Sequence, residues 1–576
     1  MIPRTSNFNY RALLIILLLL STNVEAAAAR PGDSAPGVDS DSPEKALNYG
    51  KTVRAAKDAA RSGENERAVE LFGKALAVSQ ADPGIYVDLA DALFALKRYP
   101  QAAAAYEKAR SYGFYESAES AEQIASCYLL AGDKNSALNW LEEALRSRLK
   151  ERPGIAGDER FTALGDDPRF KQIIGTVPAG ISNRKDGWNY DLDFLVSEIH
   201  RLNPVYAKEL PEEFRNRLAT LRKRLADLTD QEIGVEVMAL FATLRQGHTV
   251  MAPFGMQKGV LGHIPVQLYE FSDGIFVIDA PETNRDLIGS EVLAINGVDV
   301  SIISKSIEPY ISRDNDYFLH FAVPIALTCP DLLKAVGVKI QGEFVEFKVR
   351  KGASVTTQRL QTLPAIDPEK LAMKLIAPRV STAPSPDYLS HLDKNFWLKS
   401  LDDATLYVQI NQCLDEEKET LDQFADTLDH AVKTGKPHNV ILDVRLNNGG
   451  NYSKMFGVLK VLFSFEREPN ARLFVIAGRN TLSAAQNFIN AIDQFGAAVF
   501  VGEPSGSRPD HVGDDTTVVL PYSGIIGSIA CALHQTDFRD QREWIAPQLP
   551  ITLSSGAYFS QRDPVVETIM KFVASN

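Results

Sequence analysis

The chain has 576 residues, of which 45% are apolar and 23% are charged, and its formal net charge is −13. This length accommodates several domains, and this composition is typical of a globular chain rather than a disordered one. Phosphate backbones and anionic membrane surfaces bind basic patches, so the negative charge argues against nucleic acid and anionic membranes as main partners.

The first 27 residues have the pattern of a secretory signal peptide. Arg4 and Arg11 precede an apolar run at 12–20, and small residues follow near 26–27. That run is too short to span a bilayer, which takes about 20 residues, although an uncleaved anchor is the alternative. We therefore expect a cleaved signal at 1–27 and a polar linker at 28–43. The mature protein is expected to be secreted or periplasmic, without a membrane span.

Four cysteines are scattered singly along the chain, at Cys127, Cys329, Cys413 and Cys531. Without a Cys-x-x-Cys pair, this spacing indicates neither a zinc site nor a disulfide scaffold. Buried free thiols are expected, with one long-range disulfide as the alternative.

A helical repeat of 34 to 35 residues occupies the next part of the chain. Three segments share small, large and small side chains at one spacing: Ala68, Phe72 and Ala75; Ala102, Tyr106 and Ala109; and Ala137, Leu141 and Ala144. Small residues let paired helices pack closely, and the period resembles that of tetratricopeptide repeats. We expect an all-α repeat array at 44–178 that binds a peptide or a partner protein, with an unrelated helical bundle as the alternative.

Two smaller modules are expected after the repeats. Residues 186–256 read as amphipathic helices with polar starts, ending at Gly247-His248-Thr249. Residues 257–353 are rich in strands, and Asn296-Gly297 is a favoured type I′ hairpin turn. The segment around this turn resembles the central hairpin of a PDZ domain. Such modules bind extended peptides at an open sheet edge, and a closed, purely structural version is the alternative.

Residues 385–575 are expected to form an α/β core with two informative turns. A buried strand at 440–444 leads into Gly449 and Gly450, and a second strand at 473–477 leads to Ser483 at the start of a helix. Glycines let backbone N–H groups approach a ligand closely, and a helix start favours developing negative charge. Either turn alone is an ordinary strand-to-helix connection, but the pair in this order indicates a nucleophile beside an oxyanion site.

The segments NVILDVRLNNGG at 439–450 and NTLSAAQNF at 480–488 resemble the core of the C-terminal processing (tail-specific) peptidases. The tricorn core protease and retinoid-binding-protein-like proteins are their relatives. The resemblance covers about 186–575 and implies a crotonase-like (ClpP-like) α/β catalytic core within a multidomain α+β and α/β chain. It also implies that Ser483 is the nucleophile. The oxyanion would be held by backbone at Gly449 and Gly450 and after the serine, at Ala484.

The base that activates Ser483 is the main departure from the tail-specific peptidases. They use a lysine about 25 residues after the serine, where this chain has Arg508, whose guanidinium cannot give up its proton. The tricorn-like branch instead uses a histidine and a late acid, which by resemblance are His248 and Glu543. Histidine, with an ordinary pKa of about 6.5, suits proton transfer near neutrality. His511 is the rival base, and Arg508 is a candidate for binding a substrate carboxylate.

The sequence therefore predicts an exported serine peptidase that acts on proteins or peptides and needs no metal or organic cofactor. The alternative is an inactive protein on the same fold that binds peptides or a partner. A third interpretation is a binder of hydrophobic ligands, as the retinoid-binding relatives suggest.

Overall fold

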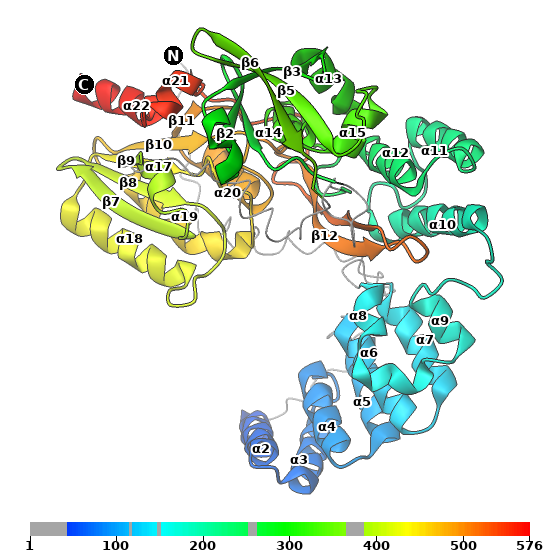
Figure 1. Ribbon diagram of the computed structural model, residues 1–576. Coiled ribbons are helices and arrows are strands. Elements are labelled where there is room, and N and C mark those ends of the chain that lie inside the picture. Colours follow the sequence, from blue (N-terminus) through cyan, green and yellow to red (C-terminus); the bar gives the residue numbers. More distant parts are fainter. Residues whose placement is uncertain (1–42, 114–117, 147–150, 252–261, 364–384, 576) are drawn as a thin grey trace, which may run out of the picture. The chain divides into compact units, whose positions relative to one another are not determined.

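The chain divides into two compact units, residues 1–174 and 175–576. The computed structural model describes residues 43–113, 118–146, 151–251, 262–363 and 385–575 (Figure 1). The expected signal peptide and the linker before Pro43 lie outside the described residues. Within these described ranges, no helix is both long enough and apolar enough to cross a bilayer.

The first unit is a row of antiparallel helix pairs. The helices pack in sequence order: α2 (Pro43–Arg61) with α3 (Asn65–Val78), α4 (Pro83–Ala95) with α5 (Tyr99–Ser111), and α6 (Ala118–Leu130) with α7 (Lys134–Ala144). Short helical turns follow as α8 (Arg152–Ala156), η1 (Glu159–Leu164) and α9 (Pro168–Ile173). The first unit is therefore all-α in its described residues.

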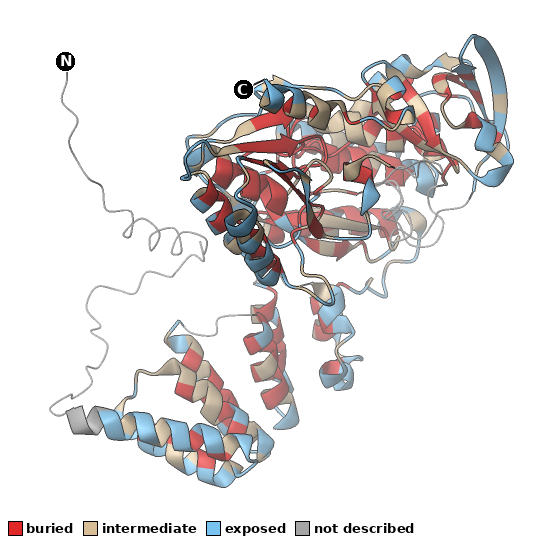
Figure 2. Cartoon of the chain, turned by 90° about the vertical axis from the view of Figure 1, so that its left-hand side faces the viewer, coloured by how far each residue is buried: buried red, intermediate tan, exposed pale blue. Residues whose placement is uncertain are grey.

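The predicted period of the helices is confirmed in their packing. The nine small or large residues that recur in α3, α5 and α7 are all at most 1% exposed. Each pair also turns at the same place, where Gly63, Lys97 and Gly132 adopt positive φ values of 78°, 60° and 87°. Figure 2 shows these helices buried on their inner faces and exposed on their outer faces.

The second unit begins with three helices, α10 (Arg184–Leu202), α11 (Glu212–Arg224) and α12 (Asp230–Ala242). They share one hydrophobic core with the antiparallel sheet that follows. That sheet has the order β1-β2-β3-β5-β6, with β4 paired to β3. Its strands are β1 (Gln267–Phe271), β2 (Gly274–Asp279), β3 (Glu291–Ile295), β4 (Val298–Asp299), β5 (Phe344–Lys351) and β6 (Ser354–Gln361).

The predicted hairpin turn at Asn296-Gly297 is confirmed. Both residues have positive φ, 45° and 78°, and Ile295 pairs with Val298 across a two-residue loop. Helices fill the connection between β4 and β5: α13 (Val300–Ile307), η3 (Glu308–Tyr310), η4 (Asp316–Phe318), α14 (Leu319–Ala326) and α15 (Pro330–Ala335). The segment 311–315 between η3 and η4 is buried throughout, and it matters for the site described below.

The outer edge of strand β1 contacts other parts of the same unit. Arg479 donates to the Glu270 carbonyl at 2.8 Å, and its guanidinium lies over the Tyr269 ring at 5.0 Å. The Ser272 N–H donates to the Leu553 carbonyl at 3.0 Å, and α14 packs along the strand. The outer edge of β1 is therefore covered by other segments of the second unit.

The α/β core is built on a sheet with the order β14-β11-β10-β9-β8-β7. Its strands are β7 (Phe396–Asp402), β8 (Thr405–Ile410), β9 (Asn439–Asp443), β10 (Arg472–Ala477), β11 (Val499–Gly502) and β14 (Leu549–Pro550). Only β7 runs antiparallel to its neighbour. Every residue of β8 and β9 is buried, as expected for parallel strands covered on both faces (Figure 2).

Helices cover the two faces of this sheet with separate apolar clusters. On one face lie α18 (Leu421–Gly435), α19 (Phe456–Phe465) and α20 (Ala484–Phe495), with η5 (Tyr452–Met455) at their edge. On the other face lies α22 (Pro564–Ala574), preceded by α21 (Ser555–Phe559). The short helix α17 (Asp387–Ser390) leads into the core, and Figure 1 shows α18 and α19 beneath β7 to β9.

A two-stranded ribbon, β12 (His511–Val519) with β13 (Ile526–His534), joins the core to the helical region. The Val250 and Ser528 backbones exchange hydrogen bonds of 3.0 and 2.9 Å, which fastens the segment after α12 to β13. This ribbon therefore carries residues of the helical region to the core.

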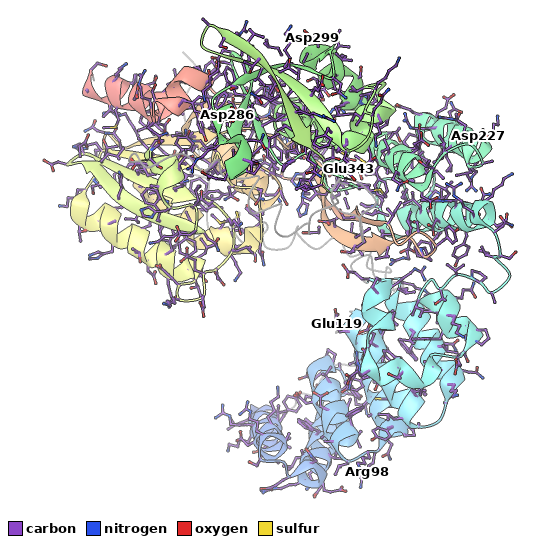
Figure 3. All side chains as sticks on the ribbon, in the orientation of Figure 1. Arg98, Glu119, Asp227, Asp286, Asp299 and Glu343 are labelled. Atoms are coloured by element: carbon purple, nitrogen blue, oxygen red, sulfur yellow. The ribbon has the colours of Figure 1, made fainter. Side chains whose placement is uncertain are left out.

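The four cysteines are buried, whereas the acidic residues labelled in the second unit in Figure 3 are exposed. All four cysteines are buried free thiols, which confirms the simpler expectation from their spacing. The acidic side chains labelled in the second unit in Figure 3, Asp227, Asp286, Asp299 and Glu343, are exposed. The labelled acids therefore lie at the surface.

We predict that a chain beginning at Gly175 folds without the repeats, because each unit has its own core. Its thermal unfolding, measured by circular dichroism, should stay cooperative, and Ser483 should label with a fluorophosphonate as in the mature chain. An insoluble or unlabelled product would make the repeats an integral part of the second unit's fold.

Candidate active site

The turn after strand β9 is a rigid bend that needs glycine. Gly449 and Gly450 have φ values of 119° and 128°, which residues with side chains rarely adopt. The Cys413 N–H donates to the Gly449 carbonyl at 2.8 Å, and the Asn451 N–H donates to the Cys413 carbonyl at 2.8 Å. A Cβ on Gly450 would lie 2.7 Å from the Cys413 carbonyl oxygen. The bend is therefore fixed against a neighbouring backbone segment.

The segment that leads to Ser483 is tied to the same bend. The Leu482 N–H donates to the Asn447 carbonyl at 3.1 Å, and the Thr481 hydroxyl donates to the Val444 carbonyl at 2.9 Å. Both acceptors follow strand β9, which is the parallel neighbour of β10. The two turns thus form one structure at the carboxyl ends of the strands, where α/β sheets place ligands.

Ser483 has a strained backbone at the first turn of helix α20. Its φ and ψ are 55° and −125°, in a region that favours glycine. Such a conformation costs on the order of 1–3 kcal/mol and persists only where the surrounding structure imposes it. A sharp strand-to-helix turn of this kind exposes the nucleophilic serine in α/β hydrolases.

Gly449 and Ser483 meet directly. A Cβ on Gly449 would lie 2.7 Å from the Ser483 Cβ and 3.2 Å from both the Ser483 Oγ and the Ala484 nitrogen. The missing side chain therefore leaves a space bordered by a hydroxyl and a backbone N–H. The Gly449 N–H itself donates to Asn447 Oδ1 at 2.9 Å. The N–H groups of Gly450 and Ala484 have no acceptor in the described residues, so they are available to an oxyanion.

His248 reaches the site from the segment after helix α12. Its carbonyl accepts a hydrogen bond from the Ser528 hydroxyl on β13 at 3.2 Å. The side chain is partly exposed, while its Nδ1 atom is buried and has no hydrogen-bond partner in the described residues. The Nδ1 atom of this ring therefore lacks a hydrogen-bond acceptor.

Three histidine rings stack beside the site. The ring centroids of His248 and His511 are 5.6 Å apart, and those of His511 and His534 are 5.1 Å apart. Burial, and then the charges of His248 and His534, hold the pKa of the His511 imidazole well below its usual range. His511 Nδ1 lies 3.2 Å from the Arg508 carbonyl, to which an N–H there donates. A neutral, buried ring of this kind is a poor proton acceptor.

Asp314 is a neighbour of His248 that the sequence analysis missed. Its Oδ1 accepts a hydrogen bond of 2.6 Å from the Gly247 N–H, although 67 residues separate the two. The residue is 9% exposed, and burial raises the pKa of its carboxyl group, while the charge of His248 opposes that rise. No spacing rule could have found it, because Asp314 lies between η3 and η4 without a motif.

Ser507 links this acid to the nucleophile. The Ser483 N–H donates to the Ser507 Oγ at 3.4 Å, and the Ser507 side chain lies close enough to Asp314 to act against the rise of that carboxyl's pKa. Asn315 donates to the Ser505 carbonyl at 3.1 Å, which fastens the same loop to the segment that carries Asp314. The fold therefore brings Ser483, Asp314 and the residues around His248 into one connected cluster.

Glu543 and Arg508 lie together at the margin of the site. Their side chains form an ion pair of 3.1 Å, with 52% of the Glu543 side chain and 32% of the Arg508 side chain exposed. The Glu543 carbonyl accepts from Asn315 at 2.9 Å, but no described contact joins the Glu543 carboxylate to His248. In this arrangement Glu543 neutralises Arg508.

The described part of the chain contains no cluster of three or more histidine, cysteine or acidic side chains that could hold a metal ion.

Comparisons with known proteins give one family match and several similar structures. The tetratricopeptide repeat family matches residues 59–113. No curated protein matches the chain. Mature CPAF complexed with lactacystin is 12% identical, with a TM-score of 0.49 over 68% of this chain and 98% of that chain.

Two further structures are each similar to part of the chain. The photosystem II D1 C-terminal processing protease is 13% identical, with a TM-score of 0.32 over 64% of this chain and 94% of its own. The N-terminal domain of stress-induced protein-1 from C. elegans is 17% identical, with a TM-score of 0.17 over 18% of this chain and 87% of its own. The family match at 59–113 lies within the helix pairs of the first unit.

Proposed function

We propose that the mature chain is an exported serine peptidase that hydrolyses peptide bonds through Ser483, with His248 as the general base. The observation that carries this proposal is the strained backbone of Ser483, held directly against the side-chain-free face of Gly449. Such strain gathers at functional sites, because the surrounding structure must hold it in place.

The proposed reaction uses only groups of this cluster. His248 takes the proton of the Ser483 hydroxyl as Oγ attacks the substrate carbonyl carbon. The negative carbonyl oxygen is held by the N–H groups of Ala484 and Gly450. The carbon–nitrogen bond then breaks, and His248 returns its proton to the leaving amine. Water, deprotonated by His248, hydrolyses the acyl ester and restores the Ser483 hydroxyl.

His248 is preferred over His511 as the base because of their environments. A base must gain a proton during the reaction, and burial keeps the pKa of His511 well below its usual range. The Nδ1 atom of the His511 ring also hydrogen-bonds the Arg508 carbonyl. His248 is partly exposed, so burial opposes the gain of a proton less there than it does at His511.

Substrate, location and partner are further parts of the proposal. The resemblance of 439–450 and 480–488 to tail-specific peptidases supports protein or peptide substrates. The expected signal at 1–27 supports export to the periplasm or outside the cell. Tetratricopeptide repeats commonly bind peptides or proteins, so the first unit would recruit a substrate or a partner.

The first test of this function uses the mature protein with a fluorophosphonate probe and an unfolded substrate such as casein. We expect labelling at Ser483, located by mass spectrometry, and cleavage of casein. Ser483→Ala should lose both. Ser483→Gly, equally inactive, should exceed Ser483→Ala in its free energy of unfolding by about 1 kcal/mol, because glycine relieves the strained φ.

Normal turnover by Ser483→Ala would remove this serine from the mechanism. A folded parent protein that neither labels nor cleaves would instead support the alternative, a binding protein built on a peptidase-like core.

The second test concerns the base. His248→Ala should slow labelling of Ser483 on the order of a thousandfold, as losing a triad member does. The matched His511→Ala should stay within about tenfold of the parent, because that ring is held neutral. The rate at which the parent protein labels should rise with pH. This rise should occur well below about pH 10, the range in which a lysine loses its proton.

If His511→Ala proved inactive and His248→Ala active, the base would lie in the loop after the nucleophile. Stopped-flow or time-resolved labelling of both variants distinguishes the two arrangements.

A further inference from the structure

A histidine that takes a proton at one ring nitrogen needs an acceptor at the other. The acceptor fixes the tautomer and stabilises the imidazolium that forms. His248 Nδ1 is buried and lacks such an acceptor in the described residues. A carboxylate near this nitrogen would complete the base, and three acidic residues are candidates: Asp314 and Asp514, which interact with the His248 charge, and Glu543, which the family resemblance implies.

Two of these carboxylates are already engaged elsewhere. Asp514 Oδ2 lies 3.2 Å from Nε2 of His534, at the far end of the histidine stack. Glu543 is paired with Arg508, and about half of its side chain is exposed to solvent. A screened carboxylate at the surface has little electrostatic effect on a ring that it does not touch.

We propose that Asp314 is the residue that positions His248, acting on the Nδ1 side of the ring. This proposal deepens the proposed function and rests on it. Asp314 is held by the residue next to the histidine, since its Oδ1 accepts the Gly247 N–H at 2.6 Å. Catalytic hydrogen bonds are often long before substrate binds. In this proposal, the hydrogen bond from His248 Nδ1 to the Asp314 carboxylate forms when substrate is bound.

Gly247 is the second observation that supports this role. A Cβ at this position would lie 3.0 Å from Asp314 Oδ2 and 3.2 Å from its Cγ. These distances are shorter than an ordinary van der Waals contact, so glycine is what lets the carboxylate lie beside the histidine. The contact with Asp314, from a distant segment, therefore explains why a glycine precedes His248 in the sequence.

The electrostatics of the cluster agree with a working pair. Burial raises the pKa of Asp314, and four neighbours oppose that rise: the charge of His248, the Gly247 N–H, the Ser507 side chain and then the Arg508 charge. The other groups that face His248 are the stacked ring of His511 and the carboxylate of Asp514. An imidazolium formed at His248 would favour the ionised form of this buried carboxyl group, because the attraction between them is weakly screened.

The contact with Ser507 extends the role of Asp314 to the nucleophile. Ser507 Oγ accepts the Ser483 N–H at 3.4 Å, and the same side chain acts against the rise of the Asp314 pKa. One buried carboxyl group thus holds the segment of the base and lies near the hydroxyl that accepts from the strained serine.

The test is the rate at which a fluorophosphonate labels Ser483 in the full mature chain, measured from about pH 5 to about pH 9. Asp314→Asn keeps an acceptor for the Gly247 N–H but removes the charge. We expect labelling to slow on the order of a thousandfold. The midpoint of the rate against pH should move lower, because a negative neighbour no longer favours the protonated ring.

Two matched variants control for charge and for position. Asp316→Asn removes an exposed carboxylate two residues away, which pairs with Arg313 at 2.7 Å, and should leave rate and midpoint unchanged. Glu543→Gln should leave partial activity and the same midpoint, because this carboxylate faces Arg508.

Gly247→Ala covers the case in which Asp314→Asn fails to fold. It keeps every charge but pushes the carboxylate away by a few tenths of an ångström, and should slow labelling by about tenfold to a hundredfold. Parent-like labelling rates in a folded Asp314→Asn or Gly247→Ala variant would overturn the proposal. A midpoint that shifts in Glu543→Gln but not in Asp314→Asn would also overturn it. If the parent does not label at Ser483, or labels without His248, the proposed function itself fails.

Discussion

The close approach of Gly449 to Ser483 is the constraint on which the rest of the site depends. The serine adopts a backbone conformation that a residue with a side chain normally avoids, and a methyl group on the glycine would overlap it. Hydrogen bonds from Leu482 and Thr481 to the segment after β9 hold both turns in this relation. The sheet order, with β9 and β10 as parallel neighbours, is what brings the two turns to one edge.

The base side of the site depends on contacts between distant segments rather than on the sheet. The β12–β13 ribbon binds the backbone after His248, and the buried segment 311–315 carries Asp314 and Asn315 between the helical region and the core. Buried polar groups of this kind are costly unless they are satisfied, so their hydrogen bonds fix one arrangement. A change in the packing of these segments should therefore reduce the activity more than it reduces the stability of either sheet.

The sequence predicted local features well and contacts between modules poorly. Strands β9 and β10, the hairpin at Asn296-Gly297 and the repeat period each follow from side-chain pattern or turn chemistry, and the structure has them where expected. The positions of Ser483 and Gly449 follow from the same local patterns. Asp314 could not be predicted, because its role arises only when a loop of the antiparallel module folds against Gly247. Glu543 was inferred from its position in a family pattern and remains a prediction, with its side chain on Arg508.

The most direct test of this account is a crystal structure of the mature protein after reaction with a fluorophosphonate. The account predicts phosphorus bonded to Ser483 Oγ, with a phosphonyl oxygen about 3 Å from the nitrogens of Ala484 and Gly450. It also predicts His248 facing the labelled oxygen with Asp314 on its Nδ1 side. Phosphorus on another residue, or a phosphonyl oxygen held by other donors with His248 turned away, would contradict it.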